Sequence, residues 1–347
     1  MKEGKSMKMK KVMAVSLTAA MAMGMMTGAA SVSAADKTYK IGICQLVQHP
    51  ALDAATKGFE DELKSELGDA VTFDEQNAAG DTATATTICQ NLVSENVDLI
   101  LANATASLQS ASAATTDIPI LGTSITDYAT ALDLSDFNGT VGGNISGTSD
   151  LAPLDKQAAM FGELLPDAKT IGILYCSAEA NSKYQADQVA KYLEDDGLTV
   201  KTYTFSDSND VTSVTGQACN ECDALYIPTD NTAASCTEAI NNVAKPAGIP
   251  IIVGEEGIME GCGIATLSIN YYTLGQATGK MAAKILKGES DISEMPIEYD
   301  TNPVKEYNPT LCEELGIKIP DDYTAYNPDS ESGAESAAAS VAESTEA

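Results

Sequence analysis

Short apolar runs alternate with longer amphipathic segments along most of the chain. The run at 40–44 is followed by residues 53–67, in which Phe59, Leu63 and Leu67 recur at four-residue spacing. That spacing is typical of a helix with one buried face. Strand-length runs that are apolar at nearly every position are typical of parallel sheets with helices on both faces. The pattern therefore predicts an α/β fold.

The same succession of runs occurs twice, about 130 positions apart. Four pairs of segments match in the same order: 40–44 with 170–174, 71–74 with 200–203, 97–105 with 222–230, and 118–122 with 249–253. Each half is expected to fold as strand–helix–strand–helix–strand–helix–strand. Two such halves predict two doubly wound parallel-sheet lobes.

Two further features indicate that the chain crosses between these lobes more than once. A glycine-rich stretch at 138–147 ends the first half, and the helix pattern at 271–286 has no counterpart in that half. We expect lobe one to comprise residues 37–148 and 270–297, and lobe two to comprise residues 149–269 and 298–326. A hinge of several crossing segments would allow the two lobes to close around a ligand.

The two ends of the chain differ in composition from the part between them. Five lysines precede an apolar run at 12–26, and a stretch of small residues follows at 27–35. This order is typical of a secretory signal peptide, here residues 1–34, and the apolar run is shorter than the roughly 20 residues that a membrane span needs. Residues 327–347 are acidic and contain almost no large apolar side chains, so we expect a disordered tail there.

The charge of the protein narrows the classes of partner. The formal charge is −30, and removing residues 1–34, which contain five lysines and one glutamate, would leave −30 − 4 = −34. So acidic a chain is a poor partner for nucleic acids and for anionic membrane surfaces. We therefore expect a soluble, exported protein that binds neither.

Eight cysteines in an exported chain leave disulfide pairing open. Cys44, Cys176 and Cys222 lie in or beside apolar runs, where a thiol usually behaves as a small buried hydrophobe. Cys219 and Cys222 have no second pair of ligands nearby, and the only histidine, His49, is far away in the sequence. Because a zinc site needs three or four ligands, we expect no metal and no cofactor.

Polar side chains follow the predicted strands in both halves. Because ligands bind beyond the carboxyl ends of parallel strands, two facing lobes would place these residues along one cleft. The candidates are Gln45, Thr105, Thr123 and Ser124 in the first half, and Ser177, Asn181, Ser182, Asp230, Asn231 and Glu255 in the second.

The chemistry of these residues favours a zwitterionic ligand. The helix after Ser177 would offer free backbone N–H groups and the positive end of its dipole to a carboxylate. Asp230 could accept hydrogen bonds from an ammonium group. The alternative, that Asn181, Ser182 and Asp230 only cap helices, stays open. Sugar or nucleoside binding is the second interpretation; the strand ends hold neither Trp nor Phe, although Tyr128 and Tyr175 are close to them.

Enzymatic interpretations find little in the sequence. It contains neither a G-x-S-x-G element nor a G-x-x-x-x-G-K-[ST] loop, and no nucleophile–base pair is evident. We expect no catalytic residues. A ligand-sensing receptor module on the same scaffold remains an alternative, whereas a transcription factor is disfavoured by the lack of a basic DNA-binding helix.

Several motifs together resemble one known family. They are QLVQHPALD at 45–53 with KGF at 57–59, SAEANS at 177–182, PTDN at 228–231, and NYYTLG at 270–275 with AAKILKG at 282–288. Between Tyr39 and Pro320 the chain resembles the tryptophan/tyrosine-type group of ABC transporter substrate-binding proteins, which have the type I periplasmic-binding-protein fold.

The resemblance implies a monomeric protein that holds a small ligand between its lobes and passes it to the permease subunits of an ABC importer. Several members are associated with aromatic amino acids, and the ten candidates above are the contacts that the resemblance implies. One departure concerns anchoring: Gram-positive members are commonly lipoproteins, but here no cysteine follows the apolar signal segment. A freely exported or loosely membrane-associated form is therefore expected.

Overall fold

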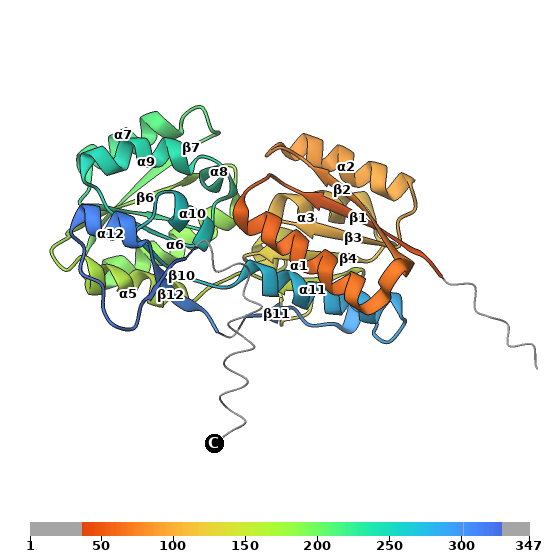
Figure 1. The fold of residues 1–347 in the computed structure, drawn as a ribbon. Helices are drawn as coiled ribbons and strands as arrows, with labels where there is room; N and C mark the ends of the chain where they lie inside the picture. Colours follow the sequence, from red (N-terminus) through yellow and green to blue (C-terminus); the bar gives the residue numbers. More distant parts are fainter. Residues whose placement is uncertain (1–36, 301, 328–347) are drawn as a thin grey trace, which may run out of the picture. The chain divides into compact units, whose positions relative to one another are not determined.

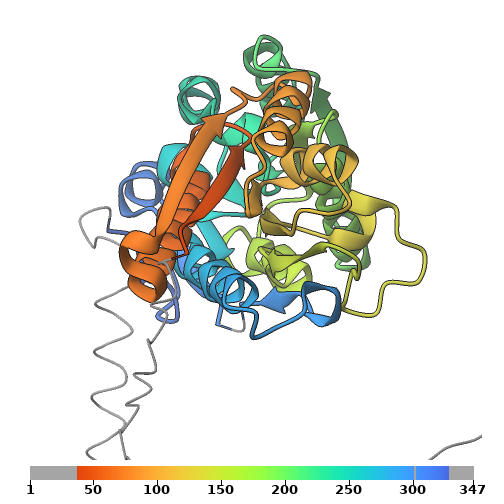
Figure 2. The ribbon, with the colours of Figure 1, turned by 90° about the vertical axis from the view of Figure 1, so that its right-hand side faces the viewer.

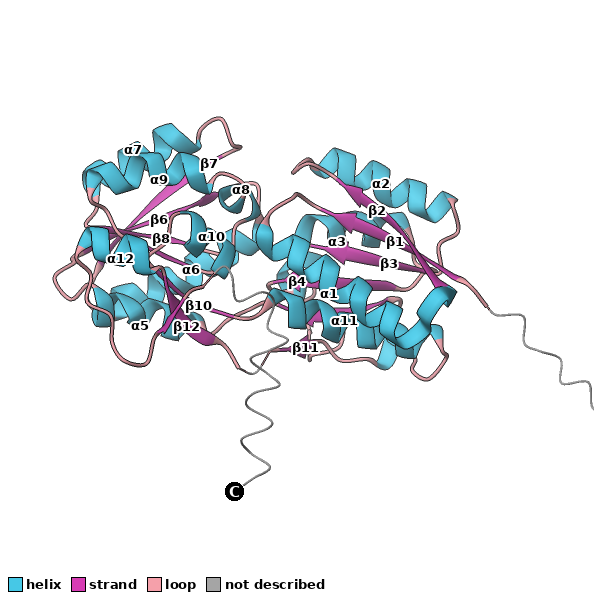
Figure 3. Ribbon diagram, viewed as in Figure 1, coloured by secondary structure: helices cyan, strands magenta, loops and turns pink. Residues whose placement is uncertain are grey.

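Two sheets form the framework of the protein. The computed structural model describes residues 37–300 and 302–327 (Figure 1). The signal peptide expected over residues 1–34 lies outside the described residues, as does the expected acidic tail beyond Asn327. Within the described part, each sheet is a layer of strands with helices on both of its faces (Figure 3).

The first sheet is entirely parallel. Its strand order is β11 (Glu298–Tyr299), β5 (Ile145–Ser149), β4 (Ile120–Ile125), β3 (Leu99–Asn103), β1 (Tyr39–Gln45) and β2 (Val71–Asn77). One apolar cluster joins one face of the sheet to α2 (Thr82–Ser94) and α3 (Thr105–Ala114). A second cluster joins the other face to α1 (Pro50–Leu67) and α11 (Tyr271–Leu286). We call this sheet and these helices the first lobe.

The second sheet repeats this plan. Its order is β13 (Thr324–Ala325), β12 (Val304–Tyr307), β10 (Ala265–Ser268), β9 (Ile251–Val253), β8 (Ala224–Ile227), β6 (Thr170–Cys176) and β7 (Thr199–Phe205), with only the β10–β12 pair antiparallel. On one face lie α5 (Leu154–Leu164), α6 (Ala180–Asp195) and α12 (Pro309–Leu315); on the other lie α7 (Val211–Glu221), α9 (Thr237–Ala247) and α10 (Glu256–Gly261). This is the second lobe.

The internal repeat predicted from the sequence is confirmed in the strand orders. The order β2-β1-β3-β4 in the first sheet corresponds to β7-β6-β8-β9 in the second. The fold class is therefore the expected one, two doubly wound α/β lobes. Short elements complete the chain: η1 (Gly68–Ala70), α4 (Tyr128–Leu132), α8 (Asn231–Ala234) and η2 (Ile292–Glu294).

One boundary between the lobes differs from the division made on the sequence. Glu298 was placed at the start of the second lobe, but β11 pairs with β5 and extends the first sheet. Without β11, β5 would be the edge strand of the first sheet. Residues 298–299 pair with this edge before the chain returns to the second lobe. Such a two-residue edge strand carries no apolar pattern that a sequence could reveal.

Helix α11 lies against α1 at the first lobe, although more than 200 residues separate them in sequence (Figures 1 and 2). Glycines allow this close approach: a Cβ added to Gly275 would lie 2.0 Å from Ala55 O, and one added to Gly58 would lie 2.1 Å from Tyr272 O. Asn270 begins α11 by accepting a hydrogen bond from the N–H of Thr273 at 2.9 Å.

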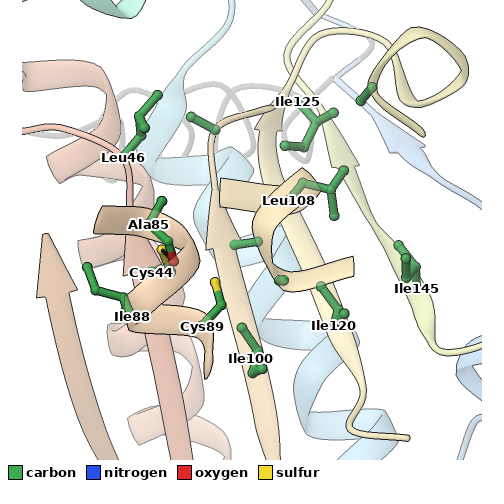
Figure 4. Packing of buried hydrophobic residues seen from close by; sticks show 14 of the residues in the cluster. Cys44, Leu46, Ala85, Ile88, Cys89, Ile100, Leu108, Ile120, Ile125 and Ile145 are labelled. Carbon is green, nitrogen blue, oxygen red and sulfur yellow. Dashed lines mark hydrogen bonds between the residues drawn. The ribbon is translucent and has the colours of Figure 1, made fainter. Parts of the chain in front are cut away.

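Buried thiols form part of the core rather than a separate chemical site. Cys44 on β1 and Cys89 on α2 are both completely buried among aliphatic side chains such as Ile88 and Ile100 (Figure 4). All eight cysteines are free thiols, and only Cys236 is partly exposed. Cys176 and Cys222 are also buried, as the sequence predicted.

Candidate functional site

A cavity of about 260 Å³ lies where the carboxyl ends of the two sheets meet. The first lobe lines it with the segments that follow β1, β2 and β3, and the second lobe with those that follow β6, β7 and β8. The lining residues are Leu46, Val47, Ala79, Gly80, Asp81, Thr82, Thr105, Ala106 and Gln109 on one side, and Cys176, Ala178, Glu179, Ala180, Asn181, Ser206, Asp207, Ser208, Asn231, Thr232 and Ser235 on the other. Equivalent strand ends of the two repeats thus enclose one space.

Hydrogen bonds beside this cavity join the two lobes. His49 Nε2 in the β1–α1 loop lies 3.2 Å from Asn231 Oδ1 at the start of α8. Gln185 Nε2 on α6 donates to Thr126 Oγ1, just beyond β4, at 3.2 Å. Since His49, Asn231, Gln185 and Thr126 are all more than nine-tenths buried, these contacts are shielded from water.

Four of the predicted site residues gather at the start of α6 and α8. Asn181 Nδ2 donates to Thr229 O at 2.9 Å, Ser182 is completely buried beside it, and Asn231 contacts the first lobe. Asp230 accepts the N–H of Cys176 and the N–H of Ala233, each at 2.7 Å. The capping interpretation of Asp230 thus describes its contacts within the second lobe.

Asp230 is nevertheless an unusual carboxyl. Burial, with a smaller contribution from the nearby charge of Glu179, raises the pKa of Asp230 to about 8. Because its two backbone donors only partly offset the burial, ionised Asp230 would be stabilised by a cationic group nearby. The residues that line the cavity include no lysine, and the sequence contains no arginine.

Glu179, which is not among the residues predicted from the sequence, organises this part of the site. Its carboxylate accepts hydrogen bonds from the backbone and side chain of Asn231 (3.0 and 2.7 Å) and from the backbone and side chain of Thr232 (both 2.8 Å). It therefore orients Asn231 toward His49. Its position three residues after β6, inside the SAEANS motif, is the signal that could have identified it.

Thr105 of the first lobe lines the cavity, and Ser124 lies near the carboxyl end of β4. Thr105 is buried, lines the cavity and is the first residue of α3, which begins without a side-chain cap. Ser124 has a φ of 56°, a left-handed conformation that a serine rarely adopts. Its Oγ is buried and has no hydrogen-bond partner. A strained residue with an unpaired hydroxyl is typical of a binding position.

Gln45 and Thr123, like Ser182 and Asp230, do not line the cavity. Gln45 is held inside the first lobe, donating to Asp53 Oδ1 at 2.6 Å and accepting from Thr56 Oγ1 at 2.7 Å. Thr123 is buried in a hydroxyl cluster with Thr148 and Thr278. Because both side chains make their hydrogen bonds inside the first lobe, we expect Gln45 and Thr123 to position the neighbouring strand ends.

Ser177 and Glu255 are likewise committed to local contacts. Ser177 is exposed and donates to Phe205 O at 3.1 Å. Glu255 accepts the N–H groups of Gly257 and Ile258 at 2.6 Å each, and so caps α10. Burial raises the pKa of Glu255 to about 7.

Asp150, which follows β5 where the chain passes between the lobes, was also missed by the sequence analysis. It accepts hydrogen bonds from Thr126 Oγ1 and from Tyr271 OH, both at 3.0 Å. Tyr271 begins α11, so this carboxyl joins two of the crossing segments. Burial raises the pKa of Asp150 to about 6. Nothing in its local sequence, SGTSD, distinguishes it from a loop aspartate.

Within residues 37–300 and 302–327, no three His, Cys, Asp or Glu side chains are grouped so that they could hold a metal ion. In the same part of the chain, none of the helices has the length and apolar character that crossing a membrane requires.

Two similar α/β lobes that close on a polar cavity at their strand ends define a two-lobed solute-binding protein. The chain belongs to the family of ABC transporter substrate-binding proteins, whose family model matches residues 40–329. A curated relative, a tyrosine-binding protein of Clostridioides difficile (strain R20291), is 35% identical over 304 residues, which cover 84% of this chain and 88% of the relative.

Solved structures agree with this assignment. The chain is similar to an ABC domain from Streptococcus pneumonia in complex with L-Trp, with a TM-score of 0.78 and 35% identity over 82% of this chain and 96% of that one. It is also similar to the ligand-free, open structure of a substrate-binding protein with adhesive properties from Clostridium difficile, with a TM-score of 0.64 and 37% identity over 84% and 99% of the two chains.

Proposed function

We propose that this protein captures an aromatic amino acid outside the cytoplasm and delivers it to the permease subunits of an ABC importer. The observation that carries the ligand assignment is the polar cavity between the lobes, whose lining includes Thr105, Glu179, Asn181 and Asn231, with the buried carboxyl of Asp230 next to Asn231 in the chain. The relatives named as tyrosine-binding and as an L-Trp complex support an aromatic amino acid. Export from the cytoplasm rests on the family and on the signal peptide that the sequence predicts.

We assign the ammonium group of the ligand to the carboxyls of the site. Asp150, Glu179 and Asp230 are acidic and mostly or completely buried, and no lysine side chain pairs with any of them within the described residues. Bringing an ammonium group among them would offset part of the cost of burying their charge. The ligand would thereby supply the positive charge that these carboxyls lack.

We assign the carboxylate of the ligand to neutral donors. Because the chain has no arginine and no lysine lines the cavity, we expect this carboxylate to be held by hydroxyl, amide or backbone N–H groups. Thr105 and Ser124 offer hydroxyls, Asn181 and Asn231 offer amides, and the uncapped start of α3 offers N–H groups. In this assignment Gln45, Thr123, Ser177, Ser182 and Glu255 position the binding residues.

The test is a thermal-shift screen of ligand-stripped protein against amino acids, sugars and nucleosides. Tyrosine or tryptophan should raise the melting temperature, because a ligand at a hundredfold excess over its Kd stabilises the folded state by about 2.7 kcal/mol. A response to sugars or nucleosides alone would replace the amino-acid assignment with the second interpretation. The importer partner is tested separately, by reconstituting uptake with the permease.

A further inference from the structure

Two carboxyl groups share the first turn of α8. The backbone N–H groups of Asn231 and Thr232 donate to Glu179, at 3.0 and 2.8 Å. The next N–H along the chain, that of Ala233, donates to Asp230 at 2.7 Å. Glu179 and Asn231 line the cavity, whereas Asp230 is only 1% exposed. A carboxyl group at the cavity wall and a buried carboxyl group therefore lie on successive N–H groups of one turn.

In the described part of the chain, no cationic group pairs with either carboxyl. His49, which faces Asn231, is neutral at pH 7 because burial lowers the pKa of its imidazole. Burial raises the pKa of the Cys176 thiol to about 11, so it is uncharged as well. Lys183 on α6 is exposed and pairs with Asp187. The other ionisable groups on the cavity lining or in the first turns of α9 and α10, which pack against α8, include the carboxyls of Asp81, Asp207, Glu238, Glu255 and Glu256.

Asp230 therefore keeps a proton at neutral pH. Burial and, to a smaller extent, the charge of Glu179 raise the pKa of Asp230 to about 8. The hydrogen bonds that Asp230 accepts lower its pKa, but they do not offset the burial. At pH 7 a group with this pKa is roughly nine-tenths protonated. Without ligand, the protein thus holds a proton beside the place where the proposed function puts a cation.

An ammonium group at the cavity wall would change this balance. A positive charge within about 4–6 Å of a carboxyl group favours its ionised form. Direct contact is not needed, because charges interact more strongly in the interior of a protein than in water. The Asp230 carboxyl would then release its proton to solvent, and its negative charge would be balanced by that of the ligand's ammonium group. The site loses one proton and gains one ammonium group, so its net charge does not change.

We propose that Asp230 gives up its proton to solvent when the ammonium group of the ligand enters the site, so that binding exchanges one proton for one cation. This inference rests on the proposed function, which assigns that ammonium group to these carboxyls. Because the proton competes with the ligand, the affinity should rise as the pH is raised from 6 to 8. The rise should end where Asp230 is ionised in the free protein as well.

Calorimetry of the intact protein tests the exchange. Tyrosine and tryptophan are titrated in phosphate and in Tris buffer, whose different ionisation enthalpies reveal the number of protons released. We expect about 0.5–1 proton released per ligand at pH 7, and a dissociation constant that falls about fivefold from pH 6.5 to pH 7.5. Binding without proton release and with constant affinity would overturn the inference and leave the proposed function intact. If neither amino acid binds, the proposed function is wrong and the inference falls with it.

Variants identify the group that releases the proton. Asp230→Asn has no acid to ionise, so it should bind the ligand without releasing a proton. Glu255→Gln and Asp150→Asn remove two other buried carboxyls with raised pKa values, and both should release as many protons as the wild type. Release that persists in Asp230→Asn would contradict the inference. If Asp230→Asn does not bind, loss of the release in Glu255→Gln or Asp150→Asn would contradict it, and unchanged release in both would support it.

Discussion

At the scale of single residues, the site is defined by polar groups whose burial is only partly compensated. Asp150 and Asp230 both accept two hydrogen bonds, yet burial still raises the pKa of each. Hydrogen bonds from neutral donors do not replace the solvation that an ionised carboxylate loses in the interior. Such residues lower the stability of the protein at neutral pH and favour a ligand that brings the missing charge.

The raised pKa of Asp150 predicts a specific pH dependence. Its folded-state pKa of about 6 exceeds the ordinary value of 3.8, so the folded state keeps a proton that the unfolded state has lost. The stability from this group is present below pH 4 and is lost as the pH rises toward 6, by about 3 kcal/mol in total. Asp150→Asn removes this loss. Urea unfolding of both proteins between pH 4 and 7 checks it, and parallel curves for the two would contradict it.

Glu179 gives a second prediction at this scale. Glu179→Gln leaves one oxygen to serve the four donors of Asn231 and Thr232, so we expect a loss of about 1–3 kcal/mol in unfolding free energy. Ligand affinity should fall too, because Asn231 loses its fixed orientation. Glu194→Gln, on the exposed side of α6, is the matched control and should change neither property. Unchanged stability and affinity in Glu179→Gln would show that the carboxylate is not needed.

At the scale of elements, the packing of α11 on α1 determines how a late segment of the chain completes the first lobe. The two helices approach so closely at Gly58 and Gly275 that backbone meets backbone. Asp150 and Tyr271, at the ends of two crossing segments, are joined by a hydrogen bond beside this packing. Close packing of α11 therefore positions Tyr271 for its contact with the site.

The glycine contact is tested by Gly275→Ala. The added Cβ would lie 2.0 Å from Ala55 O, so the helices must separate, and we expect a loss of about 1–3 kcal/mol in unfolding free energy. Gly162→Ala is the matched control, since a Cβ on Gly162 of α5 would contact nothing within 4 Å. That control should be neutral or stabilising by up to about 1 kcal/mol. Equal effects of the two substitutions in chemical denaturation would contradict the packing argument.

At the scale of the whole molecule, buried hydrogen bonds join the two lobes. We expect a bound ligand to stabilise the arrangement of the lobes in which these hydrogen bonds are made. His49–Asn231 and Gln185–Thr126 both connect lobes that share only the crossing segments as covalent links. Closing a water-free cleft strengthens the electrostatic interactions inside it. Contacts between lobes are therefore expected to slow the release of the ligand more than they speed its capture.

Thr126→Val tests this expectation. Valine keeps the shape of threonine but removes the hydroxyl that accepts from Gln185 and donates to Asp150. We expect about a tenfold weaker affinity, seen mainly as faster dissociation in stopped-flow measurements. The melting temperature without ligand should fall as well, because Asp150 loses one of its two side-chain hydrogen-bond donors. A variant that binds slowly but releases the ligand at the wild-type rate would contradict this role.

The sequence alone was sufficient for the fold, and three of its candidate site residues line the cavity. Apolar runs and helix patterns, repeated in the same order, predicted two doubly wound lobes. They do so because strands that are buried on both faces of a parallel sheet are apolar at nearly every position. The rule that ligands bind at strand ends pointed to Thr105, Asn181 and Asn231, which line the cavity, and their contact with a ligand stays a prediction.

Only the tertiary structure distinguished side chains that face the cavity from those committed elsewhere. Gln45 and Glu255 stand at strand ends as predicted, but their hydrogen bonds are made inside their own lobes. Asp150 has no local signal, and although Glu179 and His49 lie in the SAEANS and QLVQHPALD motifs, the roles of all three depend on partners more than 50 residues away, such as Tyr271, Thr232 and Asn231. Periodicity records which faces of an element are buried, whereas the pairing of polar groups depends on how distant segments meet.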